Sequence, residues 1–223
     1  MAKKQEIIKV QNEALTVGCA TICIEGDTDL VLNKMNARTK RQLTAERNGD
    51  APDKRPPNKW EDIITAVHWR DFHGDEIPDG MEDTYEDSTE DRLMELLQNN
   101  APCITAFGLK KSFKDSVVRN NIDTYSTALD ASTNVLGGKG GLVPIKFSEY
   151  SLDERLMSPK RGAPVLSRIS HFSGWAAEVR ISYQETTYSL EQIVNIINLA
   201  GFGLGIGSGR SSGYGRYHVV DVK

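Results

Sequence analysis

Four stretches of this chain have the apolar pattern of β-strands. Residues 14–24 form a run of small and β-branched apolar residues that ends at a turn, which predicts a buried first strand. Residues 142–147 and 217–222 are shorter runs of the same kind, and residues 175–183 alternate between apolar and other positions. The alternating apolar residues are Trp175, Ala177, Val179, Ile181 and Tyr183.

Two stretches instead repeat their apolar residues with the period of an α-helix. The clearer one spans residues 189–200, where Ser189 is suited to cap the helix and Gln192 to complete a capping box. The other lies within residues 101–119. One face of the first helix holds Leu190, Ile193, Ile197 and Ala200; the second has Leu109, Phe113, Val117 and Val118 at helical spacing, with Lys110, Lys111 and Lys114 off that stripe.

The order of these elements is strand, helix, strand, strand, helix, strand, which is typical of the ferredoxin-like arrangement. We therefore predict an α+β fold, with a ferredoxin-like (RRM-like) core in which helices back an antiparallel sheet. The 223 residues suit a single domain, 1–223, with long insertions. These are a basic arm at about 33–59, expected to be helical in part, and an acidic insertion at about 71–95.

Shorter patterns lie beside and within these insertions. Residues 30–32 predict a short strand, residues 60–69 a short helix or strand, and residues 90–98 a short amphipathic helix. Residues 74–89 are typical of an exposed loop. Residues 159–172 carry basic side chains and a histidine but predict no regular element.

Charge is strongly segregated along the chain. The formal net charge is −4, which argues mildly against general nucleic-acid binding. Residues 30–60, however, hold eight basic residues against three acids, and residues 71–95 hold eleven acids against one base. The whole-chain charge therefore describes neither segment.

Composition narrows the chemistry further. Three cysteines (Cys19, Cys23 and Cys103) without a Cys-x-x-Cys pair predict buried thiols in a reducing, cytoplasmic setting. The four histidines lack metal-ligand spacing, so neither a metal nor a cofactor is predicted. No apolar run approaches the roughly 18 residues of a membrane span, and the first residues show no signal-peptide pattern, so no membrane association is expected.

Residues 201–216 hold seven glycines, a density that requires a structural or functional reason because glycine loses the most entropy on folding. A phosphate-binding P-loop does not fit the register, since Leu204 stands where its first glycine should be. A dinucleotide fingerprint does not fit the glycine spacing. Both motifs also run from strand into helix, whereas this segment runs from a predicted helix into a predicted strand.

The side chains of this glycine-rich loop suggest contacts with phosphates. Backbone N–H groups in such turns can form anion-binding concavities, and Arg210 and Arg216 supply charge-assisted hydrogen bonds. Ser211 and Ser212 add hydroxyl donors, and Tyr214 is a candidate for stacking on a base. The alternative is a glycine-rich hinge or helix cap that binds no ligand.

The helix, the loop with its Gly209-Arg-Ser-Ser-Gly-Tyr-Gly-Arg216 motif and the last strand resemble the RAMP superfamily (repeat-associated mysterious proteins) over residues 190–220. These are the RNA-binding backbone and processing subunits of CRISPR effector complexes. A weaker likeness covers residues 102–114, where Leu109 and Lys110 match the family's pattern at the start of a helix. The chain departs from that pattern at Thr105 and Ala106, and it looks closer to phage-encoded relatives than to the CRISPR subunits themselves.

This resemblance implies ferredoxin-like cores, single-stranded RNA along a basic groove, and head-to-tail assembly as a homo-oligomer or larger complex. The basic arm would take the place of the protruding thumb, and we hypothesise that the acidic insertion meets a neighbour's arm. The residues expected to contact nucleic acid are Arg210, Ser211, Ser212, Tyr214, Arg216, Lys110, Lys111, Lys114, Arg38, Lys40, Arg41 and Arg168.

The leading hypothesis is a non-catalytic protein that binds single-stranded nucleic acid, with RNA favoured over DNA. A second is a phage adaptor or mimic that binds a recombinase or a host defence complex. A third is an RNA endonuclease. Its candidate residues are His68, His171 and His218 as general bases, or Asp27 and Asp29 in the turn after the first strand as supports for a metal-dependent reaction.

Overall fold

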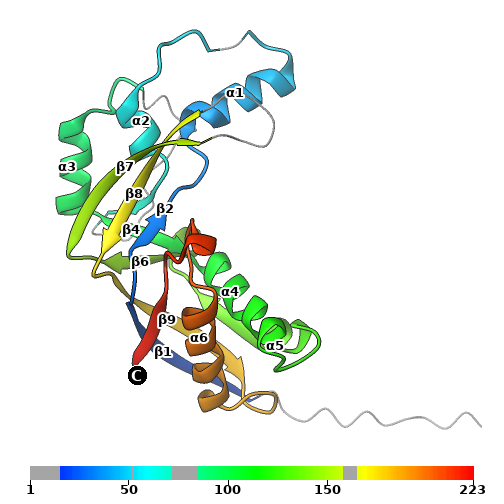
Figure 1. Cartoon of the computed structure of the whole chain (residues 1–223). Helices are drawn as coiled ribbons and strands as arrows, with labels where there is room; N and C mark the ends of the chain where they lie inside the picture. The colour runs from blue at the N-terminus through cyan, green and yellow to red at the C-terminus, as the bar shows by residue number, and fades with distance from the viewer. Residues whose placement is uncertain (1–15, 52, 72–84, 158–164) are drawn as a thin grey trace, which may run out of the picture.

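The computed structural model describes residues 16–51, 53–71, 85–157 and 165–223 (Figure 1). The helices are α1 (Ala37–Asn48), α2 (Lys59–Ile64), α3 (Glu90–Asn99), α4 (Ala106–Arg119), α5 (Thr127–Ser132) and α6 (Leu190–Gly203), with short 3₁₀ turns η1 (Lys139–Gly141) and η2 (Arg210–Ser212). The strands are β1 (Val17–Gly26), β2 (Leu30–Leu32), β3 (His68–Arg70), β4 (Ala101–Thr105), β5 (Thr133–Leu136), β6 (Leu142–Lys146), β7 (Glu149–Met157), β8 (Val165–Ser173), β9 (Ala176–Gln184) and β10 (Tyr217–Val222).

The main sheet confirms the α+β prediction and its ferredoxin-like core. Its strands run in the order β10-β1-β9-β6-β4-β3, with β5 also on β9, and every pairing is antiparallel. Strand β1, helix α4, strand β6, strand β9, helix α6 and strand β10 follow the predicted order of connections, whereas β5, which also pairs with β9, was not predicted. Helices α4 and α6 lie side by side along this part of the sheet (Figure 1).

Alternation explains which face of the sheet meets these helices. In β9, Val179 and Ile181 are buried whereas Glu178 and Arg180 are exposed. Strand β1 likewise buries its alternate residues Ala20, Ile22 and Ile24. The prediction that all the thiols are buried is wrong: Cys103 is buried, but Cys19 is exposed and Cys23 half-buried, because both lie on the outward side of β1.

Capping residues set where the two core helices begin. The predicted capping box of α6 is confirmed, since Ser189 Oγ accepts from Gln192 N at 3.2 Å and Gln192 Oε1 accepts from Ser189 N at 2.9 Å. Thr105 caps α4 by accepting from Gly108 N at 3.0 Å. The apolar stripe of α4 holds except at Val118, which is 43% exposed because the buried face turns away from it.

A second sheet, in the order β2-β8-β7, is the largest departure from the sequence prediction. The strand at residues 30–32 exists, but it pairs with β8 instead of extending the first sheet. Residues 159–172 were expected to hold no element, yet β8 begins at Val165 and forms a long hairpin with β7. Charged pairs such as Arg168 and Glu154 (3.1 Å) on this hairpin obscure its alternation in the sequence.

The two insertions differ in how much of them the structure describes. The basic arm is helical in part, as predicted, through α1 and the start of α2. The helix expected at residues 90–98 is confirmed as α3, and residues 60–69 supply both α2 and β3. Residues 72–84, most of the predicted acidic loop, lie outside the described residues. None of the helices in the described ranges is long and apolar enough to cross a membrane.

Candidate nucleic-acid interface

The glycine-rich loop folds against the chain's own backbone. Ile206 N donates to Gly215 O at 2.9 Å, which closes the loop on itself. Ser208 N donates to Val31 O and Gly215 N to Asp29 O, each at 2.8 Å, which docks the loop on β2 and on the turn before it. These three N–H groups are therefore satisfied within the protein and are not available to an anion.

Close packing accounts for much of the glycine density. Gly207 has φ +75°, and a Cβ there would lie 2.5 Å from Val31 O. Gly215 has φ +69°, and a Cβ there would collide with Ile206 O. Both positions need a left-handed backbone and a close approach of two chain segments, which only glycine provides. The glycines thus have a structural reason that does not involve a ligand.

The predicted contact residues of this loop have different surroundings. Arg216 turns back into the loop, with Nη2 3.5 Å from Arg210 O, and its Nη1 is buried without a partner among the described residues. Ser211 and Ser212 are exposed in η2. Arg210 lines a cleft beside the loop. This places Arg210, rather than Arg216, where a ligand can reach a guanidinium.

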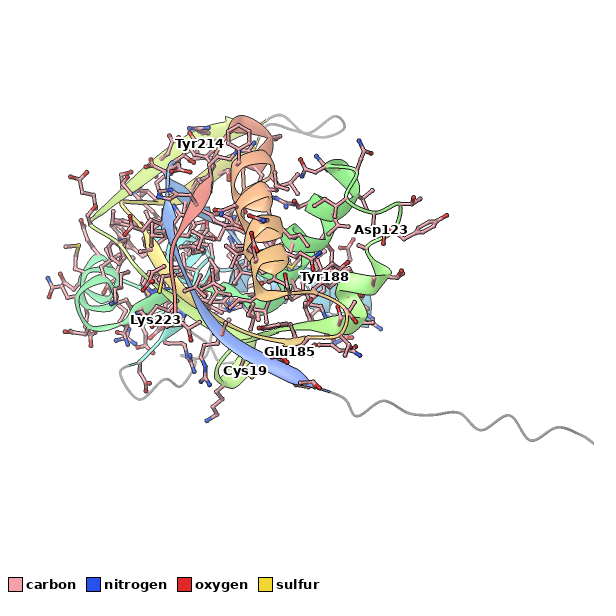
Figure 2. The ribbon with its side chains drawn as sticks, turned by 90° about the horizontal axis from the view of Figure 1, so that it is seen from below. Cys19, Asp123, Glu185, Tyr188, Tyr214 and Lys223 are labelled. Carbon is pink, nitrogen blue, oxygen red and sulfur yellow. The ribbon has the colours of Figure 1, made fainter. Side chains whose placement is uncertain are left out.

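Tyr214 is committed to the neighbouring hairpin. Its hydroxyl accepts from Arg155 Nη2 at 3.0 Å, and its ring meets the ring of His171 edge-on at a centroid distance of 5.1 Å. In the view of Figure 2, Tyr214 lies at the opposite edge from Cys19. The stacking on a base that the sequence suggested for Tyr214 would first require these contacts to break.

The cleft beside the loop has a volume of about 230 Å³, and its lining includes residues of β2 from the second sheet and of β3 and β4 from the main sheet. Basic side chains from three separate segments border it: Lys34 after β2, Lys111 of α4 and Arg210 of η2. No carboxylate belongs to its lining among the described residues. The apolar residues of the lining are Val31, Leu32, Ala66, Ile104, Leu109 and Ile206. The cleft is therefore apolar at its base and positively charged at its border.

The N-terminus of α4 adds to this positive field. Thr105 and Gly108, in the first turn of this 14-residue helix, both line the cleft. The N-terminal end of a helix carries a partial positive charge that favours anions. The weaker family likeness departed at Thr105, yet here its hydroxyl serves as the helix cap.

Two residues that line this cleft were not among the predicted nucleic-acid contacts. Lys34 lay in the basic arm but outside the contact set, and His68 was considered only as a catalytic base. Lys34 Nζ lies 3.3 Å from His68 Nδ1, and both line the cleft. The pairing of β2 with β8 and of β3 with β4 brings these segments there, and no local sequence signal reports it.

Lys110 and Lys114, predicted as contacts, face α5 instead of the cleft. Lys114 Nζ lies 2.6 Å and Lys110 Nζ 3.1 Å from the carboxylate of Asp130. Hydrogen bonds from Lys114 and then from Lys110 hold the pKa of Asp130 below its ordinary value. Lys111 differs from both, because its side chain is half exposed and its ion pair is with Asp115 one turn along the same helix, at 3.2 Å.

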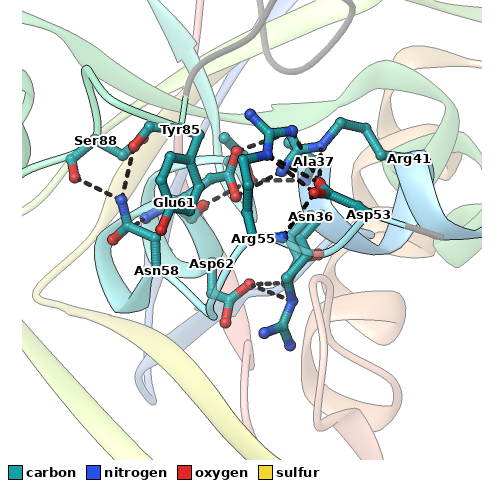
Figure 3. A network of polar contacts seen from close by, with 12 residues as sticks. Asn36, Ala37, Arg41, Asp53, Arg55, Asn58, Glu61, Asp62, Tyr85 and Ser88 are labelled. Carbon is teal, nitrogen blue, oxygen red and sulfur yellow. Dashed lines mark hydrogen bonds and ion pairs between the residues drawn. The ribbon is translucent and has the colours of Figure 1, made fainter.

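The predicted contacts of the basic arm form an internal ionic network (Figure 3). Arg41 makes two hydrogen bonds of 2.8 Å to Glu61, whose side chain is fully buried. Arg38 and Arg168 both pair with Asp62, at 3.4 and 3.2 Å. Burial raises the pKa of Asp62, and the two arginines oppose that shift.

This network holds the arm to the rest of the domain. Arg168 reaches Asp62 from β8, so the hairpin and α2 are joined, and Arg41 joins α1 to α2. Lys40 lies half-buried on α1, where its N–H donates to Asn36 O. Of the predicted contact set, only Lys111 and Arg210 are brought together at the cleft.

The aspartates and histidines considered for catalysis lie apart from the cleft, except for His68. Asp27 Oδ1 is 2.7 Å from His218 Nδ1, and both side chains are about half exposed. Asp29 lies 3.7 Å from the buried His171 and accepts from Ser173 Oγ at 2.7 Å. These contacts fix the turn after β1. No group of three or more metal-ligating side chains occurs within the described part of the chain.

Comparison with known proteins found likeness at the level of solved structures. No family model and no curated protein matches the chain. A cryo-EM structure of the type III-B Cmr-beta bound to cognate target RNA aligns with 93% of this chain at 9% identity and a TM-score of 0.49. Cmr6 from Pyrococcus furiosus aligns with 92% of it at 10% identity and a TM-score of 0.38. The alignments cover 60% and 100% of those two chains.

Proposed function

We propose that this protein binds single-stranded nucleic acid, with RNA preferred to DNA, at the cleft between the glycine-rich loop and α4. One observation carries the proposal: Lys34, Lys111 and Arg210 converge there from distant segments, and among the described residues no carboxylate joins them in the lining of the cleft. In contrast, Arg38, Arg41 and Arg168 are paired with acids inside the domain. Three cations at one cleft suit the phosphates of a single strand.

The ion pair of Lys111 with Asp115 does not oppose this role. It is a half-exposed pair one helical turn apart, a type that stabilises a helix by only about 0.2–0.5 kcal/mol. A phosphate can replace the carboxylate as partner at small cost, because each is solvated before the exchange. The resemblance of the loop motif to the RAMP superfamily favours RNA as the strand.

Salt dependence measures the number of phosphates that the cleft neutralises. Three contacts predict a slope of about −2 for the logarithm of the affinity against the logarithm of salt concentration, at about −0.7 per phosphate on a single strand. The affinity should then fall about 20-fold between roughly 50 and 200 mM salt. Fluorescence anisotropy with labelled single-stranded RNA, single-stranded DNA and duplex measures both slope and preference.

Charge removal provides the decisive test. The triple variant Lys34→Ala, Lys111→Ala, Arg210→Ala should lose affinity tenfold or more and most of the salt slope. The matched control removes Lys110 and Lys114, which lie on the same helix as Lys111 but pair with Asp130. Absence of binding to single strands at low salt, or equal losses in the two variants, would refute the proposed site.

Assembly along the strand is a further part of the proposal, implied by the family resemblance. If protomers line up on the strand, the mass of the complex should rise in steps as the RNA is lengthened. Mass photometry with RNAs of increasing length measures this. A single protomer on every length would leave binding intact and remove the assembly.

A further inference from the structure

We infer that the cleft holds one unstacked base of the bound strand, with the flanking phosphates at its border. This inference rests on the proposed function and goes beyond it, because phosphate binding alone requires only the cations. It names the group that occupies the cleft and identifies His68 and the apolar base of the cleft as the residues that contact it.

The base of the cleft has the wrong chemistry for a phosphate and the right chemistry for a nucleobase. Leu32, Ile104 and Ile206 are each less than a tenth exposed and line it with aliphatic groups. A charged phosphate gains nothing from such a surface, since burying a charge without partners is costly. The faces of a nucleobase are apolar, and covering them with aliphatic side chains is favourable.

The wall of the cleft adds a flat ring. His68 lines the cleft from β3. Histidine is one of the side chains on which unstacked RNA bases stack. Its Nδ1 lies 3.3 Å from Lys34 Nζ, so the ring sits next to one of the border cations. A base on this ring would therefore have a positive charge beside its backbone.

Size and charge distribution limit the occupant to a single base. The volume of about 230 Å³ is below the roughly 300–1,000 Å³ of pockets that enclose whole drug-sized ligands. Lys34, Lys111 and Arg210 come from three separate segments of the chain. A base inserted between them places its preceding and following phosphates near cations. An extended dinucleotide would not fit.

The contacts of Tyr214 within the protein also favour binding of the base in the cleft. The sequence made this tyrosine the candidate for base stacking, but its ring and hydroxyl are held by His171 and Arg155. A base would have to displace both contacts to stack there, whereas the cleft is open to a ligand. We therefore assign the contact with the unstacked base to the cleft and not to Tyr214.

A scan with a fluorescent base tests the inference on the whole chain. The probe is the shortest single-stranded RNA that binds one protomer, with 2-aminopurine placed at each position in turn. Emission of 2-aminopurine rises when it leaves its stacked neighbours. We expect a marked rise at one position and little change at the others. An abasic residue at that same position should weaken binding about 5- to 150-fold, the range measured for loss of one stacked base.

Cleft-filling variants locate the base. Asn33→Leu and, from the loop side, Ser208→Leu add aliphatic bulk to the lining without removing a cation. Both should abolish the position-specific emission and the abasic effect, while low-salt binding stays within a few fold. Asn99→Leu is the matched control, because it makes the same Asn-to-Leu change at an exposed position of α3. It should alter neither the position-specific emission nor the abasic effect.

The outcomes separate this inference from the proposed function. Binding with no position-specific emission and no abasic effect would refute the base in the cleft and leave phosphate binding standing. Emission that persists in both filled variants would place the unstacked base elsewhere and also refute it. Failure of the unmodified protein to bind RNA at low salt would refute both proposals.

Discussion

The basic arm and the cleft are both rich in positive charge, but the structure uses that charge in opposite ways. In the arm, Arg41 neutralises the fully buried Glu61, and Arg38 shares Asp62 with Arg168 of β8. At the cleft, Lys111 and Arg210 border an apolar depression that no carboxylate lines among the described residues. The arm's charges hold α1, α2 and the hairpin together, whereas those of the cleft face a space that a ligand can enter.

The difference shows that the density of basic residues in a sequence is a poor guide to the site where an anion binds. Most of the arm's arginines are committed to carboxylates before any ligand arrives. The cleft gathers fewer cations, from segments that are each unremarkable in sequence. Its positive potential comes from the convergence of these cations, because no carboxylate lines the cleft among the described residues.

The arm should respond to charge removal by losing stability. Arg41→Ala leaves the buried carboxylate of Glu61 without its bidentate partner, which should cost about 3–5 kcal/mol in the free energy of unfolding. Lys111→Ala should change it by no more than about 0.5 kcal/mol, since that side chain is half exposed. Chemical denaturation of the two variants measures the difference. Equal losses would mean that the arm and the cleft are not distinct.

The glycine-rich loop should depend on close packing more than on backbone freedom alone. Gly215→Ala forces a left-handed residue and a collision with Ile206 O, so we expect a loss of about 2–3 kcal/mol. Gly213→Ala also has positive φ but open space around its Cβ, and should cost about 1 kcal/mol. Thermal unfolding compares them. Similar losses of stability in the two variants would contradict close packing as the reason for the glycines.

Nucleic-acid affinity should show the reverse pattern. Lys111→Ala should weaken RNA binding about 5- to 10-fold and reduce the salt slope by about 0.7, which corresponds to one phosphate. Arg168→Ala removes a cation that pairs with Asp62 and Glu154, and should change the affinity less than about twofold. Anisotropy titrations at several salt concentrations measure both quantities. A larger loss of RNA affinity in Arg168→Ala than in Lys111→Ala would contradict the cleft as the binding site.

The pairing of Lys110 and Lys114 should appear as a small dependence of stability on pH. Because Asp130 has a lowered pKa in the folded state, its contribution is present above the ordinary aspartate pKa of about 3.9 and is lost as the pH falls through the folded value. Asp130→Asn should therefore lower the unfolding midpoint at pH 6, and this difference should shrink as the pH falls below the ordinary aspartate pKa. A difference that does not depend on pH would contradict the ion pairs.

The core of the fold was predictable from the sequence because it depends on local periods. The alternation in β9, the stripe of Leu109 and Phe113 in α4 and the capping box of Ser189 each involve residues at most four positions apart. Such patterns follow from the geometry of one strand or helix and need no knowledge of the rest of the chain. The element order, the α+β class and the position of the glycine-rich loop followed from them.

Only the tertiary structure decided which basic side chains pair with carboxylates inside the domain and which border the cleft. Arg41 and Glu61 are 20 positions apart, and Arg168 and Asp62 are 106 apart, so no local pattern connects them. The hairpin of β7 and β8, hidden by charged residues in the sequence, makes the second of these contacts possible. The cleft likewise exists only where β2, β3, α4 and the loop meet. Its chemistry is a property of that meeting, because each segment alone contributes a single cation, a ring or part of an apolar surface.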